Sequence, residues 1–199
     1  MEDNIYIMSK IYENYSKGGE NIQEEIRQEY FKNKTNLDIA AISKGMIDLC
    51  KQYKVVDWID EESCCYEFQI LLHENQEILD DDIELIRILG GERNDLRIFF
   101  SIFDKFYYMF LQKTKYDFLQ KKWYFYTIKK YSKKQKQIVQ RIADYMDRMK
   151  WTRISDSVAG TRIPDIELEL KETGQATVFN CLFTDKVDIE RIIKNSAKS

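Results

Sequence analysis

The chain has few of the residues that break regular structure. Its 199 residues include one proline and seven glycines, which excludes collagen-like, linker-rich and mucin-like proteins. There are four cysteines, two of them adjacent (Cys64 and Cys65), and this pattern does not form a disulfide framework. Hydrophobic residues make up 44% and charged residues 33%, as in a globular protein. We therefore expect a folded protein in a reducing compartment, the cytoplasm.

Long apolar runs are also absent. No stretch of about 18 apolar residues occurs, so the sequence predicts no membrane-spanning helix and no membrane partner. The acidic start, Met1 to Asn4, has no apolar segment of the kind found in secretory signals. Lysine, isoleucine and asparagine are abundant and proline is scarce, a bias typical of an AT-rich genome. Because of this bias, the number of lysines alone says little about function.

Groups for catalysis and metal binding are equally scarce. The single histidine, His73, would have to serve in any Ser-His-Asp or Cys-His arrangement. The four cysteines contain no C-x-x-C pair for zinc, and Leu85 takes the place of the glycine required in a calcium loop beginning at Asp80. No glycine-rich phosphate loop is present. We therefore predict no cofactor, no metal site and no catalytic residues.

One short match to a metal-dependent nuclease remains as a weaker alternative. Glu169 and Lys171 form a Glu-x-Lys pattern, to which Asp156 could add a second carboxylate. Two carboxylates would hold a metal ion and the lysine would lie beside the attacked phosphate. Three-letter matches of this kind arise by chance in a chain rich in lysine and glutamate.

Charge is distributed very unevenly along the chain. Residues 55–86 contain eleven acidic residues and no lysine or arginine, whereas residues 105–153 contain fourteen basic and three acidic residues. The basic stretch can face either an external polyanion or the acidic stretch of the same chain. The net charge of −3 conceals this division.

Aromatic residues are concentrated in the same region. Residues 99–131 hold fourteen of the 27 aromatic residues, and lysines follow them up to residue 136. Aromatic rings that stack on bases, joined by lysines along the backbone, are typical of proteins that bind single-stranded nucleic acid. A central aromatic core, or an interface between subunits, explains the same pattern. The candidate nucleic-acid-binding residues are Lys121, Lys122, Trp123, Tyr126, Lys129, Lys130, Lys133, Lys134 and Lys136.

Hydrophobic periodicity predicts a mainly α fold. Apolar residues at helical spacing indicate helices over 5–15, 22–30, 36–53, 62–79, 82–89, 94–111, 116–131 and 133–149. The segment 55–59 reads as a short strand or a link. We therefore predict a helical bundle-like domain over residues 1–149, carrying the acidic segment 55–86 and the basic-aromatic segment 99–136.

The residue pattern changes from helical spacing to alternation after residue 149. Strict alternation over 166–170 and the β-forming residues of 176–183 predict strands, followed by a last helix after Asp185. Residues 150–199 are therefore expected to form a small β-containing, α+β appendage, a β-hairpin or meander. A winged helix-turn-helix over 154–183 is the alternative, with helices over 155–160 and 164–173 and a wing strand after them.

These features favour a protein that acts by binding a partner over an enzyme. Our first hypothesis is a non-catalytic interaction or regulatory protein that binds a protein partner, or a second copy of itself, through a helical surface. The alternative is a nucleic-acid-binding protein that uses the basic-aromatic residues within 105–153.

Overall fold

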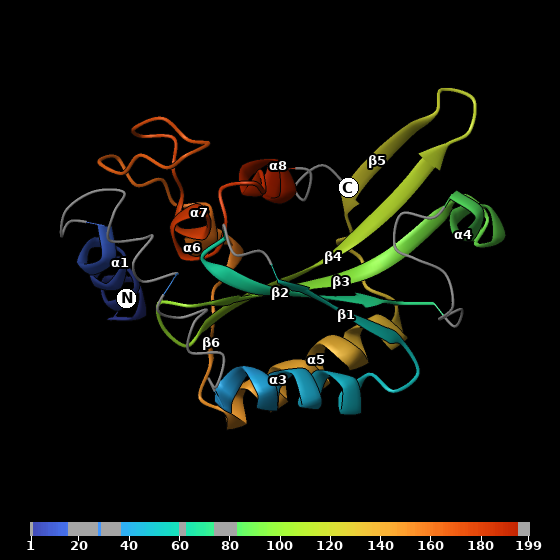
Figure 1. Ribbon diagram of the computed structural model, residues 1–199, viewed down its shortest axis with the longest axis horizontal. Helices are drawn as coiled ribbons and strands as arrows, with labels where there is room; N and C mark the ends of the chain where they lie inside the picture. The colour runs from blue at the N-terminus through green and yellow to red at the C-terminus, as the bar shows by residue number, and fades with distance from the viewer. Residues whose placement is uncertain (1, 16–27, 29–36, 60–62, 74–82, 195–199) are drawn as a thin grey trace.

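The computed structural model describes residues 2–15, 28, 37–59, 63–73 and 83–194, and its centre is a sheet. The prediction of a mainly α, bundle-like domain over 1–149 is therefore wrong. The protein has a mixed α+β fold, with a six-stranded, mostly antiparallel sheet flanked by helices. Figure 1 shows the sheet between helices on its two faces.

The sheet is formed largely by consecutive antiparallel strands. Its strands are β1 (Lys54–Ile59), β2 (Cys65–Leu71), β3 (Glu92–Ser101), β4 (Phe106–Asp117), β5 (Lys122–Thr127) and β6 (Thr152–Arg153). The first five lie in chain order across the sheet, each antiparallel to the next. Strand β6 pairs in parallel with the start of β4, whereas β5 pairs with its end.

Helices cover both faces of this sheet. They are α1 (Glu2–Tyr15), α3 (Leu37–Leu49), α4 (Ile83–Ile88), α5 (Lys133–Arg148), α6 (Asp156–Ala159), α7 (Val178–Leu182) and α8 (Ile189–Lys194). In Figure 1, α3 and α5 lie below the sheet, α6, α7 and α8 lie above it, and α1 lies at its left end. The tip of the β4–β5 hairpin projects beyond the helices, while β5 contacts α8 and β4 contacts α4.

The aromatic runs form strands because both faces of the central sheet are buried. Every residue from Leu96 to Ser101 except Arg97 is buried, and so is every residue from Phe106 to Gln112. A strand covered on both faces shows a continuous apolar run instead of alternation, and such a run resembles a buried helix. The helices predicted over 94–111 and 116–131 are therefore strands β3, β4 and β5, and most of the described part of 62–79 is strand β2.

Each face has its own core. On one face, Ile42 and Met46 of α3 and Ile138 and Ile142 of α5 pack against the even-numbered side chains of β2 and β3. Here α3 and α5 approach closely: the Tyr145 hydroxyl donates to the Ala41 carbonyl (2.9 Å), and a Cβ atom at Gly45 would overlap the Tyr145 ring.

The opposite core joins the two ends of the chain. Ile7 and Ile11 of α1 share it with Phe99 and Tyr108 of the sheet and with Phe179 of α7. Ring centroids lie 5.3 Å apart both in the Phe99–Phe179 pair and in the Tyr108–Phe179 pair. The C-terminal segment therefore covers one face of the central sheet.

Four helices are confirmed by the structure. The expectations over 5–15, 36–53, 82–89 and 133–149 correspond to α1, α3, α4 and α5, although α3 ends at Leu49. Helix α5 begins with a capping box. The Ser132 side chain accepts the Gln135 backbone N–H (3.2 Å), while the Gln135 side chain accepts the Ser132 N–H (2.8 Å). The prediction over 22–30 lies outside the described residues, apart from residue 28.

The predictions for the tail need a different correction. Residues 166–170 are not a strand, because a tight turn over 168–171 is closed by hydrogen bonds between Leu168 and Lys171, and 176–183 contain helix α7 where a strand was expected. The last helix begins at Ile189 instead of directly after Asp185. The winged alternative fails at the same place, because 164–173 is not a helix and the expected wing is α7.

No helix in the described part of the chain is long and apolar enough to cross a membrane.

Candidate functional site

The β4–β5 hairpin carries the sequence-predicted basic and aromatic residues. Its turn is fixed by Asp117, whose carboxylate Oδ1 accepts the backbone N–H groups of Leu119 and Gln120, both at 2.9 Å. Lys121 closes the turn in the left-handed conformation, with a φ of 53°. The side chain of Leu119 is 96% exposed at the tip. The hairpin is thus an ordered projection of the sheet, visible at the upper right of Figure 1.

Strand geometry separates two aromatic residues that the sequence analysis grouped together. Trp123 and Tyr126 are three residues apart, a spacing that shares a face in a helix but not in a strand. In the structure Trp123 pairs in register with Tyr116, whereas Tyr126 pairs with Lys113, so the two side chains lie on opposite faces. The predicted pair therefore does not form one stacking surface.

Trp123 instead belongs to a closed aromatic cluster at the hairpin tip. Its ring centroid lies 4.7 Å from that of Tyr116, and Tyr116 meets Phe118 edge to face at 5.1 Å. The guanidinium group of Arg87, from α4, lies over the Phe118 ring at 5.2 Å. These contacts brace the turn and hold the rings of Tyr116, Phe118 and Trp123 against one another.

The other face of the hairpin is basic and carries two tyrosines. Tyr124 and Tyr126 are stacked on it, with ring centroids 6.3 Å apart and ring planes at 13°. We call this surface the ribbon face; it consists of Lys113, Lys115, Lys122, Tyr124 and Tyr126. It continues the side of β4 that packs against α3 and α5, but beyond those helices Lys115, Lys122 and Tyr126 are exposed.

Acidic groups neutralise only part of this face. Lys113 pairs with Glu92 of β3, with 2.6 Å between the Nζ and Oε1 atoms. Between 113 and 136 there are nine lysines and one acidic residue, Asp117. No ion pair between described residues joins segment 55–86 to segment 105–153; the acidic segment's Glu67 pairs instead with Arg97 of β3 at 2.5 Å. The ribbon face therefore remains strongly positive.

The remaining predicted lysines follow directly along the chain. Lys129 and Lys130 come after β5 and are exposed, as are Lys133, Lys134 and Lys136 at the start of α5. The first turn of α5 contains no acidic residue. Cations at a helix N-terminus oppose the helix macrodipole, so these lysines stand where they weaken the helix. An anion bound nearby would remove that conflict.

Sequence reasoning found part of the ribbon face and missed the rest. Lys122 and Tyr126 lie on it, Lys121 lies at the adjoining turn, and the other predicted lysines extend the positive track. Lys113, Lys115 and Tyr124 were missed. Alternation over 112–117 and 122–127 could have identified them, because it places these three on one face once the segment is treated as a hairpin.

The other reactive groups of the chain are buried in the structure. His73 is 8% exposed, and neither ring nitrogen has a hydrogen-bond partner among the described residues; burial lowers its pKa. All four cysteines are buried thiols outside any disulfide, and burial raises the pKa of the Cys50 thiol to about 11. Among the described residues, no group of three or more His, Cys, Asp and Glu side chains could hold a metal ion.

The residues of the nuclease alternative lie in different settings. Asp156 begins α6 and accepts a hydrogen bond from the Tyr108 hydroxyl at 2.9 Å, which raises the pKa of the tyrosine in addition to the effect of burial. Glu169 is exposed in the turn before Lys171. Lys171 contributes to a pocket that Asp156 and Glu169 do not line. No described contact links the three side chains, and the nuclease function remains a prediction.

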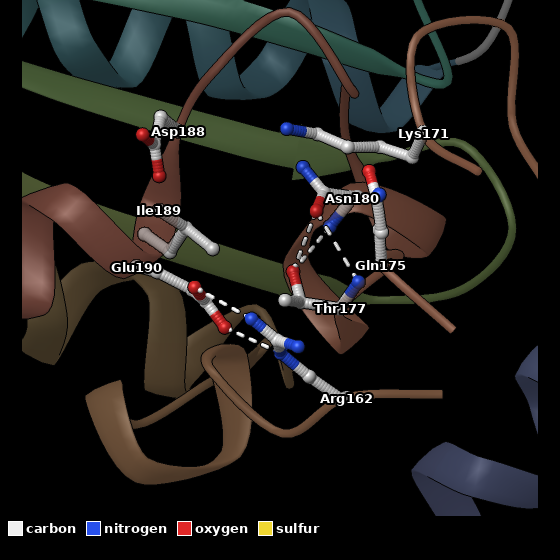
Figure 2. Close-up of a pocket in the computed structure, with 8 residues that line it drawn as sticks. All are labelled: Arg162, Lys171, Gln175, Thr177, Asn180, Asp188, Ile189 and Glu190. Atoms are coloured by element: carbon white, nitrogen blue, oxygen red, sulfur yellow. Dashed lines mark hydrogen bonds and ion pairs between the residues drawn. The ribbon is translucent and has the colours of Figure 1, made fainter. Parts of the chain in front are cut away.

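That pocket is a polar cavity of about 270 Å³ beside α7 and α8. Figure 2 shows the residues that line it, which are Arg162, Lys171, Gln175, Thr177, Asn180, Asp188, Ile189 and Glu190. One wall is a two-bond ion pair in which the guanidinium of Arg162 donates to both carboxylate oxygens of Glu190, at 2.7 and 3.1 Å. This pairing lowers the pKa of Glu190 to about 2.

Comparisons with models of known families, with curated proteins and with solved structures found no match. A functional interpretation must therefore come from the chain's own surfaces.

Proposed function

We propose that this protein binds single-stranded nucleic acid along the ribbon face. The observation that carries the proposal is the stacked pair of half-buried Tyr124 and exposed Tyr126, with exposed Lys115 and Lys122 on the same face. Every base has a π-face, so stacking on tyrosine holds a strand without regard to sequence, while lysines contact its phosphates.

The extent of the basic track favours a chain-like anion. Strand β5 is six residues long, about 20 Å when extended, and exposed lysines continue past it to Lys136 in α5. A bilayer surface would contact a projecting hairpin mainly at its tip. A phosphodiester backbone can follow the whole track, which agrees with lysines that extend well beyond the turn.

The same reasoning favours a nucleic acid over a protein partner. Protein interfaces are depleted of lysine in their central contact area, whereas phosphate binding depends on it. The hypothesis of an interaction module that acts through a helical surface remains untested, although the helical bundle expected to carry that surface is a sheet flanked by helices. Capture of a protein by this hairpin is one result that would replace our proposal.

Fluorescence anisotropy with short labelled single strands of RNA and DNA, and with duplexes, tests the proposal at low salt. We expect single strands to bind more tightly than duplexes, and the logarithm of Kd to rise linearly with the logarithm of salt concentration. Absence of single-strand binding at tens of micromolar protein, or tighter binding of duplexes, would overturn it.

The strand supplies a matched pair of variants. Tyr126→Ala removes a ring from the ribbon face, whereas Phe125→Ala removes a ring of similar exposure from the opposite face; the two are 45% and 50% exposed. We expect Tyr126→Ala to weaken binding about tenfold and Phe125→Ala to leave it within about twofold. Equal losses in both variants would contradict binding on the ribbon face.

Charge can be tested with the same logic. Replacing Lys115 and Lys122 with alanine should weaken binding and reduce its salt dependence, because two phosphate contacts are lost. Replacing Lys44 and Lys51, on and just after α3, changes the net charge equally at another surface. Equal losses from the two double variants would show only a general effect of charge.

A further inference from the structure

The pocket beside α7 and α8 is independent of the ribbon face. It brings together the turn that contains Lys171, the start of α7 and the start of α8. Its volume of about 270 Å³ lies just below the range usual for drug-sized ligands, so it fits a small metabolite.

Most polar groups in its lining are already satisfied by the protein. Asn180 is buried, and its Nδ2 atom donates to the carbonyls of Thr184 and Val187 at 3.1 and 3.2 Å. Its Oδ1 atom accepts the Thr177 hydroxyl at 2.8 Å. With Arg162 and Glu190 paired to each other, these four side chains form a rigid polar frame.

Two opposite charges in the lining are instead open to solvent, because Lys171 is half-buried and Asp188 is exposed. Among the described residues, the side-chain ammonium of Lys171 has no hydrogen bond and no ion pair. The carboxylate of Asp188 accepts one bond through Oδ1, from the Arg191 backbone N–H at 3.0 Å, and its Oδ2 has none. In Figure 2 the two side chains lie at opposite sides of the cavity, with the lysine extended across it.

The rest of the lining adds one acceptor. Gln175 is exposed and donates through Nε2 to Glu172 at 3.1 Å, which leaves its carbonyl oxygen as an acceptor. Ile189 also lies in the lining, between Asp188 and Glu190, but it is 1% exposed and packs in the core. The pocket therefore offers a ligand one cation, one carboxylate oxygen and one amide oxygen.

We infer that this pocket binds a small zwitterion, of the size and charge pattern of a free α-amino acid. Lys171 would donate to the ligand's carboxylate, and Asp188, on the opposite side of the cavity, would accept from its ammonium group. A ligand with only one charge would leave the other wall unpaired. The assignment does not depend on nucleic-acid binding at the ribbon face.

Isothermal titration calorimetry on the full chain tests this inference with the free amino acids as probes. Each amino acid that binds is compared with its C-terminal amide, which lacks the carboxylate, and with its N-acetyl derivative, which lacks the ammonium group. We expect both derivatives to bind at least about tenfold more weakly than the free amino acid. The inference is overturned if no amino acid binds, or if either derivative binds as tightly as its parent.

Two conservative variants test which protein side chain contacts each charged group of the ligand. Lys171→Met should weaken binding of the free amino acid and abolish its advantage over the amide. Asp188→Asn should abolish the advantage of the free amino acid over its N-acetyl derivative. Asparagine can still accept the Arg191 N–H in the first turn of α8, so the helix start is preserved. The same changes at Lys44 and Asp48, exposed on α3, are the controls. Unchanged discrimination in the Lys171 and Asp188 variants would place the ligand elsewhere.

Discussion

Strand β4 passes through two different environments within twelve residues. Its first part, Phe106 to Gln112, is buried on both faces between the two helical layers. Its last part, Lys113 to Asp117, leaves those layers, and there buried Thr114 and Tyr116 alternate with more exposed neighbours. One strand thus contributes both to the core and to the proposed binding surface.

The difference shows how the fold separates stability from recognition. In the sandwiched part each side chain removes apolar area from water, so its identity is fixed by packing. In the hairpin, one face braces the turn through Tyr116 and Trp123 while the other carries lysines with few partners. Variants in the two parts should therefore differ in the property they change.

The largest effect on stability is expected at Asp95, in the buried part of the sheet. Its carboxylate is 0% exposed and accepts the guanidinium of Arg93 at 2.8 to 3.1 Å. Burial raises its pKa, and Arg93 opposes that effect. Asp95→Ala should lower the free energy of unfolding by about 3–5 kcal/mol, measured by urea denaturation, because breaking a buried pair leaves a charge poorly solvated.

The control at this position removes both members of the pair. Arg93→Met combined with Asp95→Leu should restore much of the lost stability, since a buried ion pair can be replaced by apolar groups of similar volume. If Asp95→Ala unfolds at the wild-type urea concentration, the two parts of the sheet do not differ as argued.

The next effect has the opposite sign and comes from the lysines at the start of α5. Lys133→Glu together with Lys134→Glu places acidic residues where the helix macrodipole favours them, and should stabilise the protein by about 1 kcal/mol at low salt. The same variant should bind single-stranded nucleic acid more weakly. Thermal unfolding and anisotropy would measure the two effects. A variant that gains stability without losing affinity would show that these lysines do not contact the ligand.

Features determined by residues close together in the sequence could be predicted, whereas features that depend on residues far apart in the sequence could not. The helices α1, α3 and α5 were found because their apolar spacing is a local signal. Two exposed lysines of the hairpin, Lys121 and Lys122, were found as candidate residues because charge favours exposure wherever the chain runs. The faces on which Tyr124 and Trp123 lie depend on strand pairing across the turn, which single-sequence periodicity did not reveal.

The long aromatic strands were mispredicted for a related reason. Phe99 and Phe100 are both buried, one in each core, because distant helices cover both faces of β3. Alternation is lost when both faces are apolar, so the run fitted a helix equally well. The pocket was missed because its walls, the Lys171 turn and the start of α8, meet only after folding.

A smaller effect is expected at the Arg162–Glu190 pair, which is more exposed than Arg93–Asp95. Arg162 lowers the pKa of Glu190 from its ordinary value of 4.5 to about 2. A depressed folded-state pKa stabilises the protein above the unfolded value, and this contribution is lost as pH falls from about 4.5 towards 2. Glu190→Gln should therefore lower Tm slightly at neutral pH and not at all near pH 2. An equal loss at both pH values would mean that the carboxylate's charge does not stabilise the fold.

The smallest effect on stability should come from the hairpin tip, where Leu119 is 96% exposed. The turn is held by the Asp117 carboxylate and by the backbone N–H of residue 119, and neither requires the leucine side chain. Leu119→Ser should therefore change the free energy of unfolding by less than about 0.5 kcal/mol. Asp117→Ala is the comparison, because it removes the acceptor of two backbone N–H groups and should destabilise the turn. A large loss of stability in Leu119→Ser would show that the tip packs against another part of the protein in solution, and the separation between a buried sheet and a free ribbon would then fail.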